Sequence, residues 1–209
     1  MHNTFKKELN LKEYNRQQRE FFDNLTEFFL QPLPLEIRKN LERIVELAGL
    51  NEGEVILDVG SGTGILINYF LKYKPKKIIA CDLSPRMLEY LKRKFPSVET
   101  YLMDIRDLFL PDACIDVSFL NAVWPNIGDK IGALKNLYRM LKDNGRMIIS
   151  HPEGRAFVER LKNILPFPID SLPQKGELKK LLRPFGFSLK TFIDEEKFYF
   201  ALSLKRRNE

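Results

Sequence analysis

The chain has 209 residues, 44% of them hydrophobic, which is ample for one sizeable core but short for two complete domains. Its formal net charge of +6 comes from scattered lysine and arginine residues, so nucleic acid is an unlikely partner on charge alone. The two cysteines lack CxxC spacing and no apolar run approaches the roughly 20 residues of a membrane span, which argues against a disulfide framework, a zinc site and a membrane protein.

The N-terminal part of the chain predicts helices. A helix over 9–30 contains the aromatic-rich run "EFFDNLTEFF", "QPLPL" interrupts it, and apolar residues at helical spacing predict a second helix over 35–48 that ends at Gly49. The polar N-terminus lacks the apolar stretch of a signal peptide, so we expect a cytoplasmic protein. We divide the chain into a helical extension, 1–34, and a main domain, 35–209.

Beyond residue 50, apolar runs alternate with amphipathic segments, as in βαβ units. Strands are predicted over 54–59, 77–82, 98–104, 115–122 and 146–151, and helices over 65–73, 83–95, 130–142 and 156–165, with Gly145 ending the third of these helices. A last helix over 175–183 precedes two β-rich runs, 187–194 and 197–205, that are close enough to pair as a hairpin. The pattern predicts an α/β fold with a doubly wound, mostly parallel seven-stranded sheet and a terminal antiparallel hairpin.

Polar residues lie where the predicted strands end. Ligands on doubly wound sheets bind at the carboxyl ends of the strands, beside the point where strand order reverses. The residues at those positions form one candidate set: Asp58, Gly60, Ser61, Gly62, Thr63 and Gly64 after the first strand, then Asp82, Asp104, Asn121 and His151 at the ends of the next four.

The glycine-rich stretch "DVGSGTG" raises the question of ligand charge. A dinucleotide fold places pyrophosphate beside such glycines. Asp58 precedes Gly60 by two residues, and two like charges about 5 Å apart at an effective dielectric of 20 repel by roughly 3 kcal/mol. A cationic ligand reverses that sign. S-adenosylmethionine carries a sulfonium and an ammonium but no phosphate, and its ribose diol and adenine amine both suit carboxylates.

Three segments carry a resemblance to a known family. "VILDVGSGTG", "CDLSPRML" and "MDIRDL" resemble the successive motifs of class I S-adenosylmethionine-dependent methyltransferases, over roughly residues 35–150. The resemblance implies that Asp82 holds the ribose hydroxyls with Leu83 and Met87 beside the adenine. It also implies that Asp104 meets the adenine amine with Ile105 packing nearby, and that Asp58 orients the methionine end.

The segment after the fourth strand separates the subclasses of this family. It reads "NAVWPN", without the D/N-P-P-Y/F of enzymes that methylate exocyclic amines or the Pro-Cys pair of cytosine-C5 enzymes. The block "LKNLYRMLKDNGRMIIS" resembles the ubiquinone and menaquinone biosynthesis branch, with Asn144 in place of a glycine. We expect a small-molecule acceptor. The alternatives are an RNA or other nucleic-acid methyltransferase and a non-catalytic S-adenosylmethionine-binding module.

The acceptor side is less defined by sequence. "YNRQQREFFDNLTEFF" resembles a lid region of that branch, which makes Tyr14 and Phe22 candidates for the acceptor pocket, with Trp124 as a further wall. The alternative is that these three aromatic residues only pack in the protein interior. His151 is the candidate general base because an unperturbed imidazole titrates near pH 6.5, and its alternative is a structural histidine. No metal is expected, and the sequence does not indicate an oligomeric state.

Overall fold

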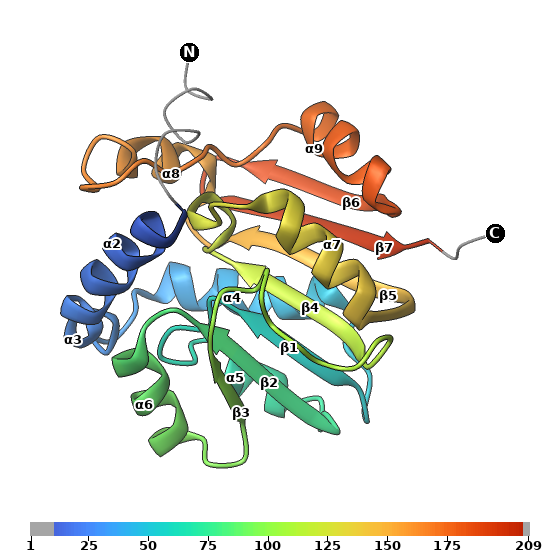
Figure 1. Cartoon of the computed structure of the whole chain (residues 1–209), viewed down its shortest axis with the longest axis horizontal. Helices are drawn as coiled ribbons and strands as arrows, with labels where there is room; N and C mark the ends of the chain where they lie inside the picture. The colour runs from blue at the N-terminus through green and yellow to red at the C-terminus, as the bar shows by residue number, and fades with distance from the viewer. Residues whose placement is uncertain (1–10, 207–209) are drawn as a thin grey trace.

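The computed structural model describes residues 11–206, and its centre is one seven-stranded sheet (Figure 1). The strand order is β3-β2-β1-β4-β5-β7-β6. The strands are β1 (Val55–Val59), β2 (Lys77–Asp82), β3 (Glu99–Leu102), β4 (Ile115–Asn121), β5 (Leu141–His151), β6 (Phe187–Glu195) and β7 (Phe198–Lys205).

Strands β1 to β5 are parallel, whereas β7 runs antiparallel to both of its neighbours. From β1 the chain moves outward through β2 to β3, then returns to β4 on the other side of β1. The reversal places the switch point of the sheet between the carboxyl ends of β1 and β4, where ligands of such sheets bind. The predicted doubly wound sheet with a terminal hairpin is confirmed.

Helices cover both faces of the sheet because successive residues of a buried strand point to opposite sides. Ile56 and Ile78 belong to the apolar cluster under one helical layer, whereas Leu57 and Ile79 belong to the cluster under the other. The first layer contains α4 (Leu35–Ala48), α5 (Ile67–Leu71) and α6 (Pro85–Lys94), and the second contains α7 (Lys130–Met140), α8 (Gly154–Leu161) and α9 (Lys175–Leu182). Short 3₁₀ turns, η1 (Trp124–Asn126) and η2 (Arg183–Phe185), follow β4 and α9.

The N-terminal helices lie beside the carboxyl ends of the parallel strands (Figure 1). Two helices, α2 (Leu11–Asn24) and α3 (Thr26–Phe29), replace the single predicted helix, because the helical conformation is interrupted at Leu25. Tyr14 of α2 belongs to the main apolar cluster of the sheet. Residues 1–10 of the predicted extension lie outside the described residues, and the domain division at residue 34 stays a prediction.

The end of α7 differs from the sequence prediction. The helix stops at Met140 because Leu141 is already extended (φ −69°, ψ 140°) and pairs with Ile115 of β4. The left-handed position in this turn is Asn144, with φ +60°, so Gly145 does not end the helix as predicted. Asparagine tolerates that conformation better than most residues do.

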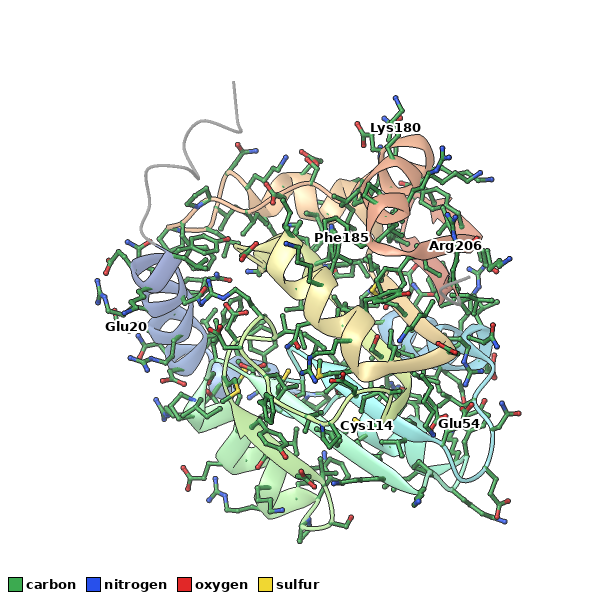
Figure 2. The ribbon with its side chains drawn as sticks, turned by 45° about the vertical axis from the view of Figure 1, so that its right-hand side comes forward. Glu20, Glu54, Cys114, Lys180, Phe185 and Arg206 are labelled. Atoms are coloured by element: carbon green, nitrogen blue, oxygen red, sulfur yellow. The ribbon has the colours of Figure 1, made fainter. Side chains whose placement is uncertain are left out.

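The opposite end of the sheet is closed by an ion pair. Arg146 of β5 binds Glu54 and also donates to the carbonyl of Ala48 at 3.2 Å. Figure 2 shows Glu54 on the far side of the molecule from Glu20, which lies on α2. This ion pair therefore lies at the end of the sheet opposite to the carboxyl ends of the parallel strands. Within residues 11–206, no helix combines the length and apolar character needed to cross a membrane.

Candidate functional site

The loop after β1 turns sharply under the switch point. Gly60 adopts φ +64° and Gly62 φ +51°, a region that residues with a Cβ rarely enter. The amides of Gly60 and Ser61 both donate to the carbonyl of Cys81, at 2.8 and 3.2 Å. A Cβ on Gly60 would lie 2.3 Å from Cγ2 of Val123. The backbone of this loop therefore approaches its neighbours more closely than any side chain would allow.

Asp82 ties this loop to the end of β2. Its Oδ2 accepts the Gly62 amide at 2.8 Å, and its Oδ1 accepts the Ser84 amide at 2.9 Å. Burial raises the pKa of Asp82, while the backbone amides that bind it act in the opposite direction. A partly buried carboxylate is thus fixed beside the glycine loop.

The carboxyl group of Asp58 is buried. The residue is 2% exposed, and its Oδ2 has no hydrogen-bond partner among residues 11–206. Burial, with a smaller contribution from repulsion by Asp82, raises the pKa of Asp58 to about 8. Ser61 Oγ, also buried, has no partner in the same part of the chain. Buried polar atoms are normally satisfied, so these two indicate a place for a ligand with a positive charge or donors.

Asp104 lies two residues beyond β3. Its Oδ1 accepts the Arg106 amide at 2.9 Å, and its Oδ2 accepts Nδ2 of Asn15 at 2.6 Å. Ile105 beside it is buried at 4% exposure. The carboxylate is therefore held from two sides, once by its own loop and once by helix α2.

A hollow of about 460 Å³ opens between α2 and the ends of β2 and β3. Leu83 and Asp104 line it, whereas Met87 is buried on α6, with its Sδ 3.5 Å from the position of a Cβ on Gly62. Thr63 is half-buried in the glycine loop. Of these four residues, Leu83 and Asp104 line the hollow, and Met87 and Thr63 lie outside its lining.

Asn121 closes the site on the β4 side. It is 8% exposed, and its Oδ1 accepts the hydroxyl of Ser150 at 3.0 Å. The two residues are register partners on β4 and β5. The bond fixes the Asn121 amide at the switch point.

The predicted acceptor-pocket residues Tyr14 and Trp124 belong to the main apolar cluster, and Phe22 packs against it. Trp124 is 1% exposed, and Tyr14 is 3% exposed with its hydroxyl donating to the carbonyl of Pro168 at 2.8 Å. Phe22 is half-buried, with its ring centroid 6.2 Å from that of Phe167. Packing explains Trp124 and Tyr14 in this conformation, and the acceptor-pocket role of all three residues stays a prediction.

His151 ends β5 and is 5% exposed. Burial lowers its pKa to about 4, below the value expected from sequence, because the apolar surroundings, including Phe157, disfavour the charged ring. Its Nδ1 accepts the Glu153 amide at 3.2 Å, which leaves the proton of the neutral ring on Nε2. This geometry favours the structural role, and the general-base role stays a prediction.

A pair of variants separates the two roles of His151. General-base catalysis increases a rate by about 10² to 10⁴. If His151 is the base, His151→Ala should lower the single-turnover rate by this factor and leave cofactor affinity unchanged. His151→Gln keeps an acceptor for the Glu153 amide but supplies no base. If His151→Gln has the rate and the melting temperature of the unaltered chain, His151 has a structural role. A loss of rate in both variants would confirm the catalytic role.

Sequence reasoning did not identify Asn15 and Asp23 of α2 as site residues. The carboxylate of Asp23 accepts the Ser84 hydroxyl and, at 3.3 Å, the Arg86 amide, at the start of α6. The helical spacing of Asn15 and Gln18 beside Tyr14 was the available signal, but it does not show which loops these polar groups would contact.

Residues 11–206 contain no group of three or more His, Cys, Asp or Glu side chains that could hold a metal.

Comparisons with known proteins point to one family. Residues 57–149 match the family described as "Methyltransferase domain". The malonyl-[acyl-carrier protein] O-methyltransferase of Serratia marcescens is 32% identical over 109 residues, which cover 52% of this chain and 42% of that protein. The ubiquinone/menaquinone biosynthesis C-methyltransferase of Vibrio vulnificus is 27% identical over 142 residues, 64% of this chain and 55% of that protein. The chain thus spans about half the length of these relatives.

The fold has solved counterparts. A SAM-dependent methyltransferase from Aquifex aeolicus superposes with a TM-score of 0.71 at 21% identity, covering 88% of this chain and 98% of that one. Residues 57–149 are therefore similar to a methyltransferase domain, and the chain has the fold of a solved SAM-dependent methyltransferase.

Proposed function

We propose that this chain is an enzyme that transfers a methyl group from S-adenosylmethionine to a small-molecule acceptor. The observation that carries the proposal is the buried carboxylate of Asp58, whose Oδ2 has no partner within residues 11–206 and which lies beside a glycine loop. Such a group is costly to bury unless a cation joins it. The ammonium and sulfonium of the cofactor meet that requirement, whereas the pyrophosphate of a dinucleotide does not.

The remaining strand-end residues suit the rest of the cofactor. We assign Asp82 to the ribose hydroxyls, because it is held beside Gly62, and Asp104 to the adenine amine, because it lines the hollow with Leu83. Ile105, Met87 and Asn121 complete the surroundings. When bound, the cofactor supplies a methyl group that is electrophilic because it is attached to a sulfonium.

The protein's contribution is positioning and the exclusion of water. Asp82 and the Ser84 turn hold the glycine loop in place, and α2 covers the strand ends through bonds to Asp104 and Ser84. Methyl transfer by in-line displacement depends mainly on such alignment in a dry site. Tyr14, Phe22 and Trp124 are proposed to face the acceptor side.

A small acceptor is supported by the named activities of the relatives and by the absence of the nucleic-acid motifs after β4. One relative is named for quinone biosynthesis and another for malonyl-[acyl-carrier protein] methylation.

The cysteines Cys81 and Cys114 are both unpaired, which suits the proposed cytoplasmic location. Incubation with methyl-labelled cofactor and pooled metabolites separates an enzyme from a binding module, because only an enzyme produces S-adenosylhomocysteine in an acceptor-dependent way.

The cofactor assignment predicts a selective thermal shift. S-adenosylhomocysteine at 100 times its dissociation constant should stabilise the folded chain by about 2.7 kcal/mol and raise its melting temperature, whereas NAD should not. The reason is that the ligand's ammonium attracts Asp82 and favours the ionised form of Asp58, whereas the pyrophosphate of NAD would repel both carboxylates. Differential scanning fluorimetry with both ligands provides the measurement. A larger shift with NAD, or none with saturating S-adenosylhomocysteine, would contradict the proposed function.

Binding should also release a proton from Asp58. Its pKa in the free protein is about 8, so the carboxyl is mostly protonated at pH 7, and a bound ammonium favours the ionised form. Affinity should therefore rise with pH up to about 8. Calorimetry at pH 7 in buffers of different ionisation enthalpy measures the released proton. Asp58→Asn, which cannot titrate, is the control and should bind more weakly without proton release.

A further inference from the structure

Helix α2 is anchored on one side by buried polar contacts. The Tyr14 hydroxyl donates to the carbonyl of Pro168, and Nε2 of Gln18 donates to the carbonyl of Asn126 at 3.0 Å. Tyr14 and Gln18 are each 3% exposed. These bonds connect the helix to η1 and to the segment after α8. The orientation of α2 about its own axis is thereby fixed.

A second face of α2 is turned toward the hollow at the ends of β2 and β3. Lys12, Asn15, Arg16 and Arg19 line the hollow, and their spacing of three and four residues places them along one stripe of the helix. Leu83, Leu102 and Met103 supply apolar wall, and Asp104 supplies a carboxylate. Arg106 and Asp107 complete the lining, so a flat ring with polar edges would lie against the apolar wall with charged groups around it.

The orientation of the Asn15 carboxamide follows from its partner. A carboxylate accepts hydrogen bonds and does not donate them, so the Asn15 atom 2.6 Å from Asp104 Oδ2 is the Nδ2 donor. One hydrogen of Nδ2 is used in this bond. The second hydrogen of Nδ2 remains available for a ligand in the hollow that Asn15 lines.

We propose that Asn15 is a specificity-determining residue that reads the adenine base of the cofactor together with Asp104. This inference rests on the proposed function. Adenine presents an amine donor next to a ring-nitrogen acceptor. Asp104 can accept from the amine on a remaining lone pair, and the second hydrogen of Asn15 Nδ2 can donate to the ring nitrogen. The bond from Nδ2 to Asp104 also holds the carboxamide in the required orientation. The base is thus read from the sheet and from the covering helix at once.

The test compares two ligands that differ at the base. S-adenosylhomocysteine carries the amine, and S-inosylhomocysteine carries an oxygen acceptor in its place. The unaltered chain should prefer the adenine ligand by about tenfold or more, and Asn15→Leu should reduce this preference by about tenfold. Asn15→Asp, which loses the donor hydrogens at similar size, should reduce it as well and serves if the leucine variant folds poorly. Gln17→Leu is the matched control, because Gln17 is a neighbouring amide on α2 whose side chain bonds to Glu13 of the same helix.

The outcomes separate the possible roles of Asn15. If Asn15 only fastens α2, its variants weaken both ligands by the same factor and the preference is unchanged, which would overturn the inference. An unchanged affinity for both ligands would overturn it too. Failure of the unaltered chain to bind S-adenosylhomocysteine would instead overturn the proposed function, and this inference with it.

Discussion

Asp82→Ala is expected to weaken the binding of S-adenosylhomocysteine by about 1.5 to 3 kcal/mol, a loss of roughly 10- to 150-fold. Two effects combine in this loss. The ribose hydroxyls lose a charged acceptor, and the amides of Gly62 and Ser84 lose the carboxylate that holds them at 2.8 and 2.9 Å. The glycine loop should therefore become less ordered before any ligand arrives.

The measurement is calorimetric titration alongside the melting temperature of each variant. Asp82→Asn separates the two effects, because its amide oxygen still accepts one backbone hydrogen but carries no charge. Asp116→Ala is the matched control: Asp116 also binds a backbone amide, that of Val55 at 2.8 Å, but at the opposite end of the sheet. Equal affinity in the folded Asp82→Ala variant and the unaltered chain would place the ribose elsewhere.

The strand-end residues are predictable from sequence for a simple reason. Apolar runs of five or six residues that end in a polar residue define buried parallel strands, and parallel strands share one carboxyl edge. Asp58 and Asp82 follow directly from this rule. Asp104 lies slightly farther out than predicted, because β3 ends at Leu102.

The contacts of α2 are not predictable in the same way. Helical periodicity shows that Tyr14 and Phe22 lie on an apolar side, but the partners of Asn15 and Asp23 are 89 and 61 residues away in the chain. Such pairs depend on how the helix docks. The burial that lowers the pKa of His151 likewise arises from packing against α8, which sequence spacing does not specify.

Gly60→Ala is expected to reduce the free energy of unfolding by about 2 to 5 kcal/mol. A left-handed residue with a Cβ costs about 1 to 2 kcal/mol, and forcing an extra carbon into a packed site costs about 1 to 3 kcal/mol more. Gly60 has φ +64°, and its added Cβ would meet Val123 Cγ2 at 2.3 Å and Val123 Cβ at 2.6 Å. Both costs therefore apply at this position.

Two companion variants distinguish strain from crowding. Gly53 has φ +83° and nothing within 4 Å of an added Cβ, so Gly53→Ala should show the conformational cost alone. Val123→Gly removes both atoms that Gly60→Ala would strike, so in that background the Gly60 substitution should cost about as much as Gly53→Ala. Urea unfolding of the four chains of the Gly60 and Val123 cycle, with Gly53→Ala beside them, measures the coupling. If Gly60→Ala costs no more than Gly53→Ala in the unaltered background, the loop has room for a side chain, and close backbone approach is not the reason that glycine stands at residue 60.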